Sequence, residues 1–291
     1  MSQSRRAHAA ACMAEIHPTA IVDCRAELAD DVAVGAYTII KAGVTVGPGT
    51  VIQEHCHVHG NTVIGRNCKI GPNAYVGLPP QHTKHDGVNT RAIIGDEVVI
   101  REGASVHRSI YPEAEHATRV GNRCFVMGSG HIGHDCVLGE EVIVAHGAML
   151  GGHCLVGDRT FIGGGAAIHQ FVRIGRLAII KGNEGVTSDV PPFAAVRYDG
   201  LKGYNAIGCK RSGMPASTLR AIRAAYHCIH THRTLPGAIA AIRATVPMLP
   251  EIEELLEFFR TTKRGVLGSV RGAALARMGL GKPTAPEGDS E

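Results

Sequence analysis

The sequence predicts an all-β protein with an α-helical tail, in which a parallel β-helix of hexapeptide repeats precedes a small C-terminal helical domain. Three observations predict this fold. Isoleucine, valine or leucine recurs at every sixth residue over most of the chain, and glycine often stands directly after it. The repeat stops at Pro191-Pro192, and beyond Pro215 the apolar residues recur at helical spacing.

The hexapeptide series covers residues 16–76, resumes in phase over 94–106, and continues over 120–186 after a shift of two residues. All 26 positions of the series hold Ile, Val or Leu. A period of six fits neither a helix nor a simple strand alternation, but it fits a short strand and a tight turn that repeat together. The recurring apolar residue then points inward, which is typical of a parallel β-helix.

Glycine follows many of the apolar positions, as at Gly35, Gly47 and Gly121. We expect these glycines to supply turn conformations that would strain other residues. Three hexapeptides make one triangular coil of 18 residues, so the series corresponds to about nine coils. Stacked at ~4.8 Å per strand, these coils predict a prism ~40 Å long.

The repeat and its interruptions divide the chain into parts. Two insertions leave the repeat, and because insertions in a solenoid leave as loops on one face, we expect both to be functional. After the repeat, Leu219, Ile222, Ala225 and Ile229 lie at helical spacing, and 235–246 and 250–261 are expected to be two more helices. The expected parts are a disordered extension (1–15), a β-helix (16–200) with loops at 77–93 and 107–119, a helical domain (201–265) and a disordered tail (266–291).

Composition excludes several classes of protein. The net charge is only +4 and no Lys/Arg-rich run occurs, so we expect no nucleic-acid partner. Nine cysteines without a CxxC pair favour reduced thiols in a cytoplasm over a disulfide framework or zinc knuckle. No stretch reaches 18 apolar residues, so we expect no integral membrane segment.

The 18-residue coil places chemically useful side chains together. His134 is expected to stack on Gly152, and Gly152 on Gln170. In the same way Asp135 is expected to stack on His153, and His153 on Phe171, with His131 and His169 nearby. A base, an exposed backbone N–H and a polar recognition group then share one pocket. The chain has 17 histidines, so ordinary packing and a metal-binding ladder remain alternatives, although His131 and His134 carry no obvious Cys or carboxylate set.

Four segments carry a resemblance to a known family: GHIGHDCVLG (130–139), MLGGHCLVGD (149–158), GGGAAIHQFVRIG (163–175) and SDVPPFA (188–194). They are similar to the acyl-[acyl-carrier-protein]–UDP-N-acetylglucosamine O-acyltransferases, and the resemblance covers roughly residues 16 to 267. It implies left-handed coils and a cytoplasmic homotrimer with its sites between subunits. It also implies transfer of an (R)-3-hydroxyacyl chain from acyl carrier protein to the sugar 3-hydroxyl, the first step of lipid A synthesis, without a cofactor or metal.

The same resemblance implies residue roles. His134 matches the general base, Asp135 the acid that orients it, and Gly152 the backbone N–H for the oxyanion. Gly182 matches the position that limits acyl length. Positions matching substrate contacts are Lys84, His131, His153, His169, Gln170, Asn205 and Arg211, and basic residues that could meet the acidic carrier protein are Arg220, Arg223 and Arg243.

Some positions depart from the family pattern. His82 stands where an aspartate is usual, Ile207 and Ser212 where a glutamate and a second arginine are frequent, and Lys181 where a small residue is common. These departures leave a 3-amino UDP-sugar or another sugar nucleotide open as the acceptor.

Three other classes remain alternatives. The related N-acyltransferase of the pathway carries an N-terminal uridine-binding domain, which we do not expect because the repeats start at Ile16. A non-enzymatic hexapeptide scaffold and a carbonic-anhydrase-like metalloprotein are the others.

Overall fold

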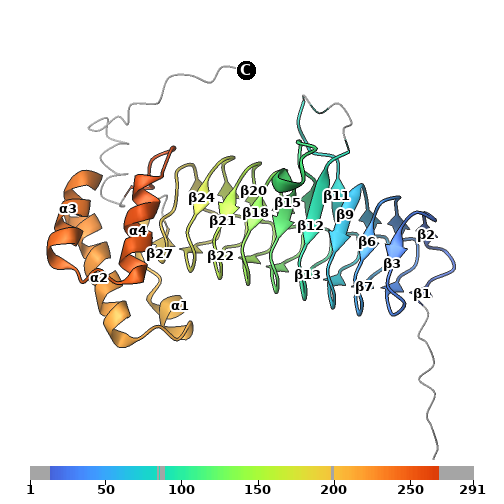
Figure 1. Ribbon diagram of the computed structural model, residues 1–291, viewed down its shortest axis with the longest axis horizontal. Helices are drawn as coiled ribbons and strands as arrows, with labels where there is room; N and C mark the ends of the chain where they lie inside the picture. The colour runs from blue at the N-terminus through green and yellow to red at the C-terminus, as the bar shows by residue number, and fades with distance from the viewer. Residues whose placement is uncertain (1–13, 84, 86–88, 198–199, 269–291) are drawn as a thin grey trace, which may run out of the picture.

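The computed structural model describes residues 14–83, 85, 89–197 and 200–268. They form a left-handed parallel β-helix with helices stacked at its C-terminal end (Figure 1). The strands are very short, mostly two residues, because each one spans only a flat side of a triangular coil before the chain turns. The predicted fold class is therefore confirmed.

Three parallel sheets form the sides of the prism. The first sheet consists of β1 (Glu15–Ile16), β4 (Ala33–Val34), β7 (Val51–Ile52), β10 (Lys69–Ile70), β13 (Val99–Ile100), β16 (Phe125–Val126), β19 (Ile143–Val144), β22 (Phe161–Ile162), β25 (Ile179–Ile180), β27 (Ala194–Val196) and the antiparallel β28 (Leu201–Tyr204). The second consists of β2 (Ile21–Val22), β5 (Ile39–Ile40), β8 (His57–Val58), β11 (Tyr75–Leu78), β14 (Ser105–His107), β17 (His131–Ile132), β20 (Met149–Leu150), β23 (Ala167–Ile168) and β26 (Gly185–Val186). The third consists of β3 (Glu27–Leu28), β6 (Thr45–Val46), β9 (Asn61–Ile64), β12 (Arg91–Ile94), β15 (Thr118–Val120), β18 (Val137–Leu138), β21 (Leu155–Val156) and β24 (Arg173–Ile174).

The strand register follows the 18-residue coil. Ile132 pairs with Leu150, and Leu150 pairs with Ile168, so residues 18 apart stack as predicted. Across the first insertion Val76 pairs with Val106, which keeps the phase. The two insertions leave the same side of the prism near β11 and β15 (Figure 1), and the second one contains a 3₁₀ turn over Ala114–His116.

Most of the glycines that follow the apolar positions do not have the role that the sequence suggested, although Gly77, with φ of 77°, does. The left-handed residue of each turn lies two positions further on, and at the corner after β17 it is Asp135, with φ of 57°. Gly47, by contrast, has no positive φ. A Cβ there would lie 2.8 Å from the carbonyl carbon of Gly65 and 3.0 Å from the nitrogen of Arg66. These glycines allow close stacking of successive coils rather than an unusual backbone conformation.

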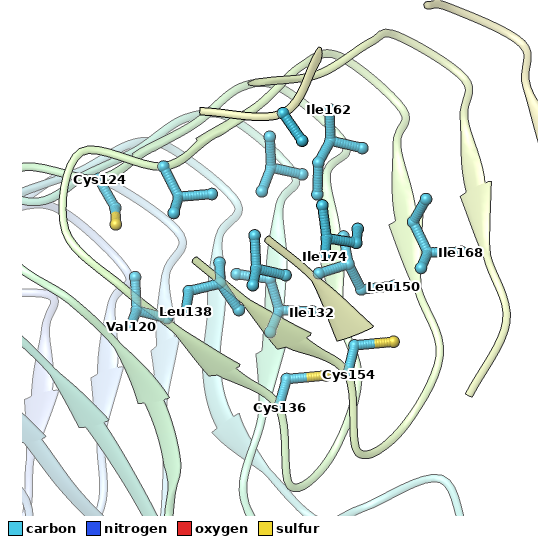
Figure 2. Packing of buried hydrophobic residues seen from close by; sticks show 14 of the residues in the cluster. Val120, Cys124, Ile132, Cys136, Leu138, Leu150, Cys154, Ile162, Ile168 and Ile174 are labelled. Atoms are coloured by element: carbon cyan, nitrogen blue, oxygen red, sulfur yellow. The ribbon is translucent and has the colours of Figure 1, made fainter. Parts of the chain in front are cut away.

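The interior of the prism contains two stacked rows at each corner. From Val34 on, the recurring apolar residue is buried. Two residues before it stands a second inward side chain, and at several corners this is a threonine or cysteine that bonds to the next coil. Thr38 Oγ1 donates to the carbonyl of Gln53 over 2.6 Å, and Cys124 Sγ donates to that of Gly139 over 3.1 Å. Figure 2 shows Cys136 and Cys154 stacked on successive coils in this row, with both thiols pointing the same way. The cysteines that the structure describes are unpaired, and all except Cys24 are buried.

The C-terminal helices are α1 (Ala206–Arg211), α2 (Ala216–Thr231), α3 (Leu235–Thr245) and α4 (Pro250–Arg260). Helix α1 was not predicted, although Asn205 accepts a hydrogen bond from the N–H of Gly208 as its N-cap. Val266 and Leu267, expected in a disordered tail, instead pair with Asp189 on the prism. Residues 1–13 and 269–291 lie outside the described residues. In the described ranges, no helix is long and apolar enough to cross a bilayer.

The inward row predicts a contrast between adjacent residues of β9. Ile64 is 1% exposed, whereas its neighbour Val63 is 40% exposed. Ile64→Ala should lower the free energy of unfolding by about 2–5 kcal/mol because it leaves a cavity between coils. Val63→Ala should lower it by about 0.5 kcal/mol. Denaturant unfolding of both variants tests this, and equal losses would show that the inward row does not carry the stability.

Candidate active site

A pocket of about 340 Å³ opens beside the corner between the second and third sheets. Its floor is backbone, because Gly133, Gly151 and Gly152 carry no side chains. Its walls carry imidazole and amide groups from β14, from β17 and the turn after it, from the turn after β23, and from the first insertion. The lining side chains are Gln81, His107, His131, His134, Ile168, His169 and Gln170.

His134 and Asp135 form a buried pair at this corner, each 8% exposed. The Nδ1 atom of His134 lies 2.6 Å from Oδ2 of Asp135. This bond places the proton on Nδ1 and leaves Nε2 as the acceptor toward the pocket. A carboxylate in this position also stabilises the imidazolium that forms when Nε2 takes a proton. The pair is therefore built as a general base with its orienting acid.

The second insertion holds the carboxylate of this pair. The backbone N–H of Ile110 donates to both oxygens of Asp135, at 3.3 and 3.2 Å. The N–H of Asp135 donates to Oγ1 of buried Thr118 over 2.8 Å. Asp135 has a positive φ, a conformation that a non-glycine residue keeps only when its surroundings hold it. The 107–119 insertion thus supplies part of the support for the dyad.

Gly152 lies directly beneath the imidazole of His134. A Cβ at Gly152 would lie 2.5 Å from Nε2 of that ring, which is too close for any side chain. The predicted stacking of His134 on Gly152 is confirmed by this contact. The glycine lets the base lie flat against the backbone, so the reacting atom and the backbone N–H can share one small space.

The N–H of Gly152 has no hydrogen-bond partner among the described residues. Some equivalent N–H groups on other coils do have one. The N–H of Arg66 donates to Asp96 over 3.0 Å, and that of Glu140 donates to Asp158 over 2.8 Å. In these two places the N–H points outward, to a side-chain oxygen on the next coil. At Gly152 it is free for an oxygen of a ligand.

His131 and His107 form a second imidazole pair on the pocket wall, with ring centroids 5.2 Å apart. Nδ1 of His107 donates to the carbonyl of Pro79 over 2.7 Å, which ties the two insertions together. Oγ of Ser105 lies 2.8 Å from Nδ1 of His131. Burial, together with the neighbouring His107 and His134, lowers the pKa of His131 to about 4, so this ring is neutral at pH 7.

His153 completes the arrangement around the carboxylate. Its Nε2 lies 3.8 Å from Oδ2 of Asp135, and its ring stacks on Phe171 with centroids 4.4 Å apart, as the coil predicted. Burial lowers the pKa of His153, although the Asp135 charge opposes this shift.

One ligand atom each from His134, Asp135 and His153 lies within 4.8 Å of the others, a spacing that could hold a metal ion. A metal there would have to separate the two atoms of the 2.6 Å dyad bond.

Other residues with expected roles lie elsewhere on this chain. Asn205 and Arg211, with Ile207 and Ser212, line a separate hollow of about 870 Å³ on the first sheet beside α1. The amide of Asn205 also donates to the carbonyl of Leu177 over 2.8 Å. Thus the structure does not bring these residues to His134 within one subunit.

Two further expected residues are not part of the dyad pocket. Gly182 follows β25 at the edge between the first and second sheets, where a Cβ would lie 2.9 Å from the carbonyl oxygen of Gly164. That edge is not the one that carries His134. Lys84 lies outside the described residues.

Sequence reasoning missed Ser105, His107, Thr118 and Ile110. The insertion between 106 and 120 changes the spacing of stacked residues from 18 to 26, so that Ser105 lies against His131. Counting by 18 residues fails across this insertion. When the extra residues of the insertion are allowed for, the hexapeptide series does place residue 105 beside residue 131. Nothing in the sequence reveals the N–H contact of Ile110, because it depends on the path of the loop.

Comparison with known proteins agrees with this geometry. Residues 44–77 match the bacterial transferase hexapeptide model, and residues 189–267 match domain 2 of UDP N-acetylglucosamine O-acyltransferase. The acyl-[acyl-carrier-protein]–UDP-N-acetylglucosamine O-acyltransferase of Syntrophobacter fumaroxidans is 42% identical over 87% of this chain and 99% of its own length. The namesake enzyme of Alkalilimnicola ehrlichii is also 42% identical, over 88% of this chain and 100% of its own.

Solved structures agree as well. The UDP-N-acetylglucosamine acyltransferase of Francisella novicida superposes with a TM-score of 0.83 at 29% identity, covering 89% of this chain and 96% of its own. LpxA from Acinetobacter baumannii superposes with a TM-score of 0.81 at 35% identity, covering 87% and 99%.

The stacked hexapeptide coils and the His–Asp dyad above a glycine floor define a hexapeptide-repeat acyltransferase. Among such enzymes, the chain belongs to the acyl-[acyl-carrier-protein]–UDP-N-acetylglucosamine O-acyltransferase family. The resemblance predicted from the four motif segments is therefore confirmed.

The lowered pKa of His131 predicts a pH dependence of stability. The ordinary histidine pKa is 6.5 and the folded value is about 4, so between these pH values the unfolded chain binds a proton that the folded chain does not. Stability should therefore fall as pH falls from 6.5 to 4. His131→Gln should reduce proton uptake on unfolding near pH 5 by about one proton. Unfolding measured across this range tests this, with Met149→Leu in the same row as a non-titrating control. Unchanged uptake in His131→Gln would contradict it.

Proposed function

We propose that this protein transfers an (R)-3-hydroxyacyl chain from acyl carrier protein to the 3-hydroxyl of UDP-N-acetylglucosamine, the first step of lipid A synthesis. The observation that carries the proposal is the His134–Asp135 dyad beside the unpartnered N–H of Gly152. The named relatives are acyl-carrier-protein–UDP-N-acetylglucosamine O-acyltransferases, which fits a site with a base and an oxyanion donor but no serine, cysteine or lysine side chain among the described lining residues.

The chemistry proceeds by direct attack. Nε2 of His134 takes the proton of the sugar hydroxyl while that oxygen attacks the thioester carbon. The carbonyl oxygen becomes an oxyanion that the Gly152 N–H stabilises. When the C–S bond breaks, the departing thiolate of the carrier receives the proton from His134. The base can act because its position is fixed. Asp135 binds Nδ1 of His134, and Ile110 and Thr118 in turn hold Asp135.

The substrate contacts are part of the same proposal. His131, His153, His169 and Gln170 lie in or beside the dyad pocket, where imidazoles and an amide can bind sugar hydroxyls. His82 contributes a ring 5.5 Å from that of His134, edge to face. Lys84 and the acyl-limiting role of Gly182 remain expectations from the family pattern.

We further propose a cytoplasmic homotrimer whose sites lie between subunits. The outward side of the first sheet carries a continuous half-buried apolar row, formed by Val99, Phe125, Ile143, Phe161 and Ile179. Such a strip favours contact with another chain. A head-to-tail ring joins different faces of neighbouring subunits. It would therefore bring the Asn205 and Arg211 hollow of one subunit to the His134 pocket of the next.

The carrier protein is the proposed macromolecular partner. Arg220 and Arg223 on α2 and Arg243 on α3 are exposed on the helical end and offer positive charge to an acidic protein. Their position at the end of the prism leaves the dyad pocket open to the acyl chain. Association through such groups should weaken as ionic strength rises.

His134→Ala should lower kcat by at least 10²-fold with the fold retained, because the base is lost. Purified protein is mixed with (R)-3-hydroxyacyl carrier proteins of several lengths and UDP-N-acetylglucosamine or its 3-amino analogue, and products are read by mass spectrometry. Acylation of the 3-hydroxyl supports the proposal. Acylation of only the amino sugar would move the acceptor to the alternative class, and near-normal turnover by His134→Ala would exclude it as the base.

Mixing subunits tests the shared site. His134→Ala and Arg211→Ala homomers should each be nearly inactive, but unfolding and refolding them together at equal amounts should restore about a quarter of the wild-type rate. This gain arises because some clefts then receive both intact sides. The same variants refolded separately and then combined are the control. No recovery in mixed oligomers would show that both residues act within one chain.

A further inference from the structure

We propose that Cys136 is a positioning residue for acyl transfer, because its thiol holds the Gly151–Gly152 peptide with the Gly152 N–H facing the reacting thioester. The inference rests on the proposed function, since that function gives the N–H its oxyanion. It extends the dyad into a unit of three successive residues. His134 is the base, Asp135 orients it, and Cys136 fixes the group that receives the developing charge.

The geometry begins inside the prism. Cys136 is fully buried, and its Sγ lies 3.1 Å from the carbonyl oxygen of Gly151. That carbonyl and the N–H of Gly152 belong to one peptide unit. In a trans peptide the two groups point in opposite directions, and the described chain has no cis peptide. Because the thiol binds the carbonyl from the core side, the N–H is directed outward to the pocket.

The same inner contact recurs on other coils, which shows what it does. Thr50 donates to the carbonyl of Gly65 over 2.8 Å, and Cys124 donates to that of Gly139 over 3.1 Å. In both places the N–H that follows, of Arg66 or Glu140, is bound from outside by an aspartate. Each of these peptides is thus held at both ends.

The Gly151–Gly152 peptide is held only from the inside, as is the Gln53–Glu54 peptide bound by Thr38. What distinguishes it is its place directly beneath the imidazole of His134. The next coil offers Gln170 at the equivalent place, and within the described residues no bond joins it to the Gly152 N–H. A peptide between two glycines also has the widest backbone freedom of any pair. Cys136 is therefore the contact that fixes the orientation of this peptide unit before substrate binds.

The thiol is suited to this task at all working pH values. Burial raises the pKa of Cys136 well above its usual range, so the sulfur keeps its proton and remains a donor. A thiolate in this place would repel the carbonyl instead. Loss of the donor should loosen the N–H without moving His134, whose ring is held by Asp135 and by the neighbouring rings of His153 and His82.

The test compares three variants of the full-length protein. Cys136→Ala removes the donor and should lower kcat about tenfold, a fraction of the 10²–10³ that loss of a whole oxyanion donor costs. KM for both substrates should stay within about twofold, because the N–H acts on the transition state. Cys136→Ser should retain kcat, since threonine hydroxyls already make this bond at Thr38 and Thr50.

Cys124→Ala is the matched control. It removes the same kind of buried bond at another corner of the prism, and should lower the thermal midpoint as much as Cys136→Ala while leaving kcat unchanged. Equal kcat in the two alanine variants would overturn the inference and leave the proposed function intact. So would a change in KM alone, or a shift in the acidic limb of the pH–rate profile, which would mean that the dyad had moved. If wild-type protein acylates no acceptor, the proposed function itself fails, and the role of Cys136 with it.

Discussion

The parallel register of 18-residue coils is the constraint on which the rest of the molecule depends. Each residue lies against its counterpart one coil away, so side chains distant in sequence meet without any long-range search. The register also fixes which backbone groups are used. Several inward small residues bind carbonyls of the next coil, and a few outward N–H groups bind its polar side chains. At Gly152 the outward N–H has no such partner among the described residues, and the residue lines the pocket.

The coil register has a chemical consequence for the site. The base, its carboxylate and the oxyanion donor come from the same corner of two adjacent coils, so no hinge or loop has to close to bring them together. The loops add support instead, with Ile110 binding the carboxylate and Pro79 binding His107. The reacting groups thus lie on the rigid β-helix, and the loops support them from outside. Precise catalytic geometry favours such an arrangement. Burial, together with the neighbouring rings of His107 and His134, keeps the pKa of His131 low, so this ring next to the dyad is neutral at pH 7.

Much of this was accessible from sequence, for a definite reason. A strict repeat converts sequence distance into spatial distance, so the stacking of His134 on Gly152 and of His153 on Phe171 could be counted rather than guessed. What could not be counted lay where the repeat is interrupted. The contacts of Ile110 and His107 depend on loop paths, and the role of the post-apolar glycines was wrong because their close neighbours lie on another coil. The hollow at Arg211 lies on the first sheet, away from the corner that carries His134, so counting by 18 does not connect the two.

The stacked coils also limit how such a protein can be adjusted. Adding or removing a coil keeps the register but moves the C-terminal helices relative to the dyad by one strand spacing, ~4.8 Å. Such a step is much coarser than the length of one methylene group. A prism of this kind therefore cannot set the length of an acyl chain by its own height. Under the proposed function, chain length has to be graded by single side chains along the prism edges.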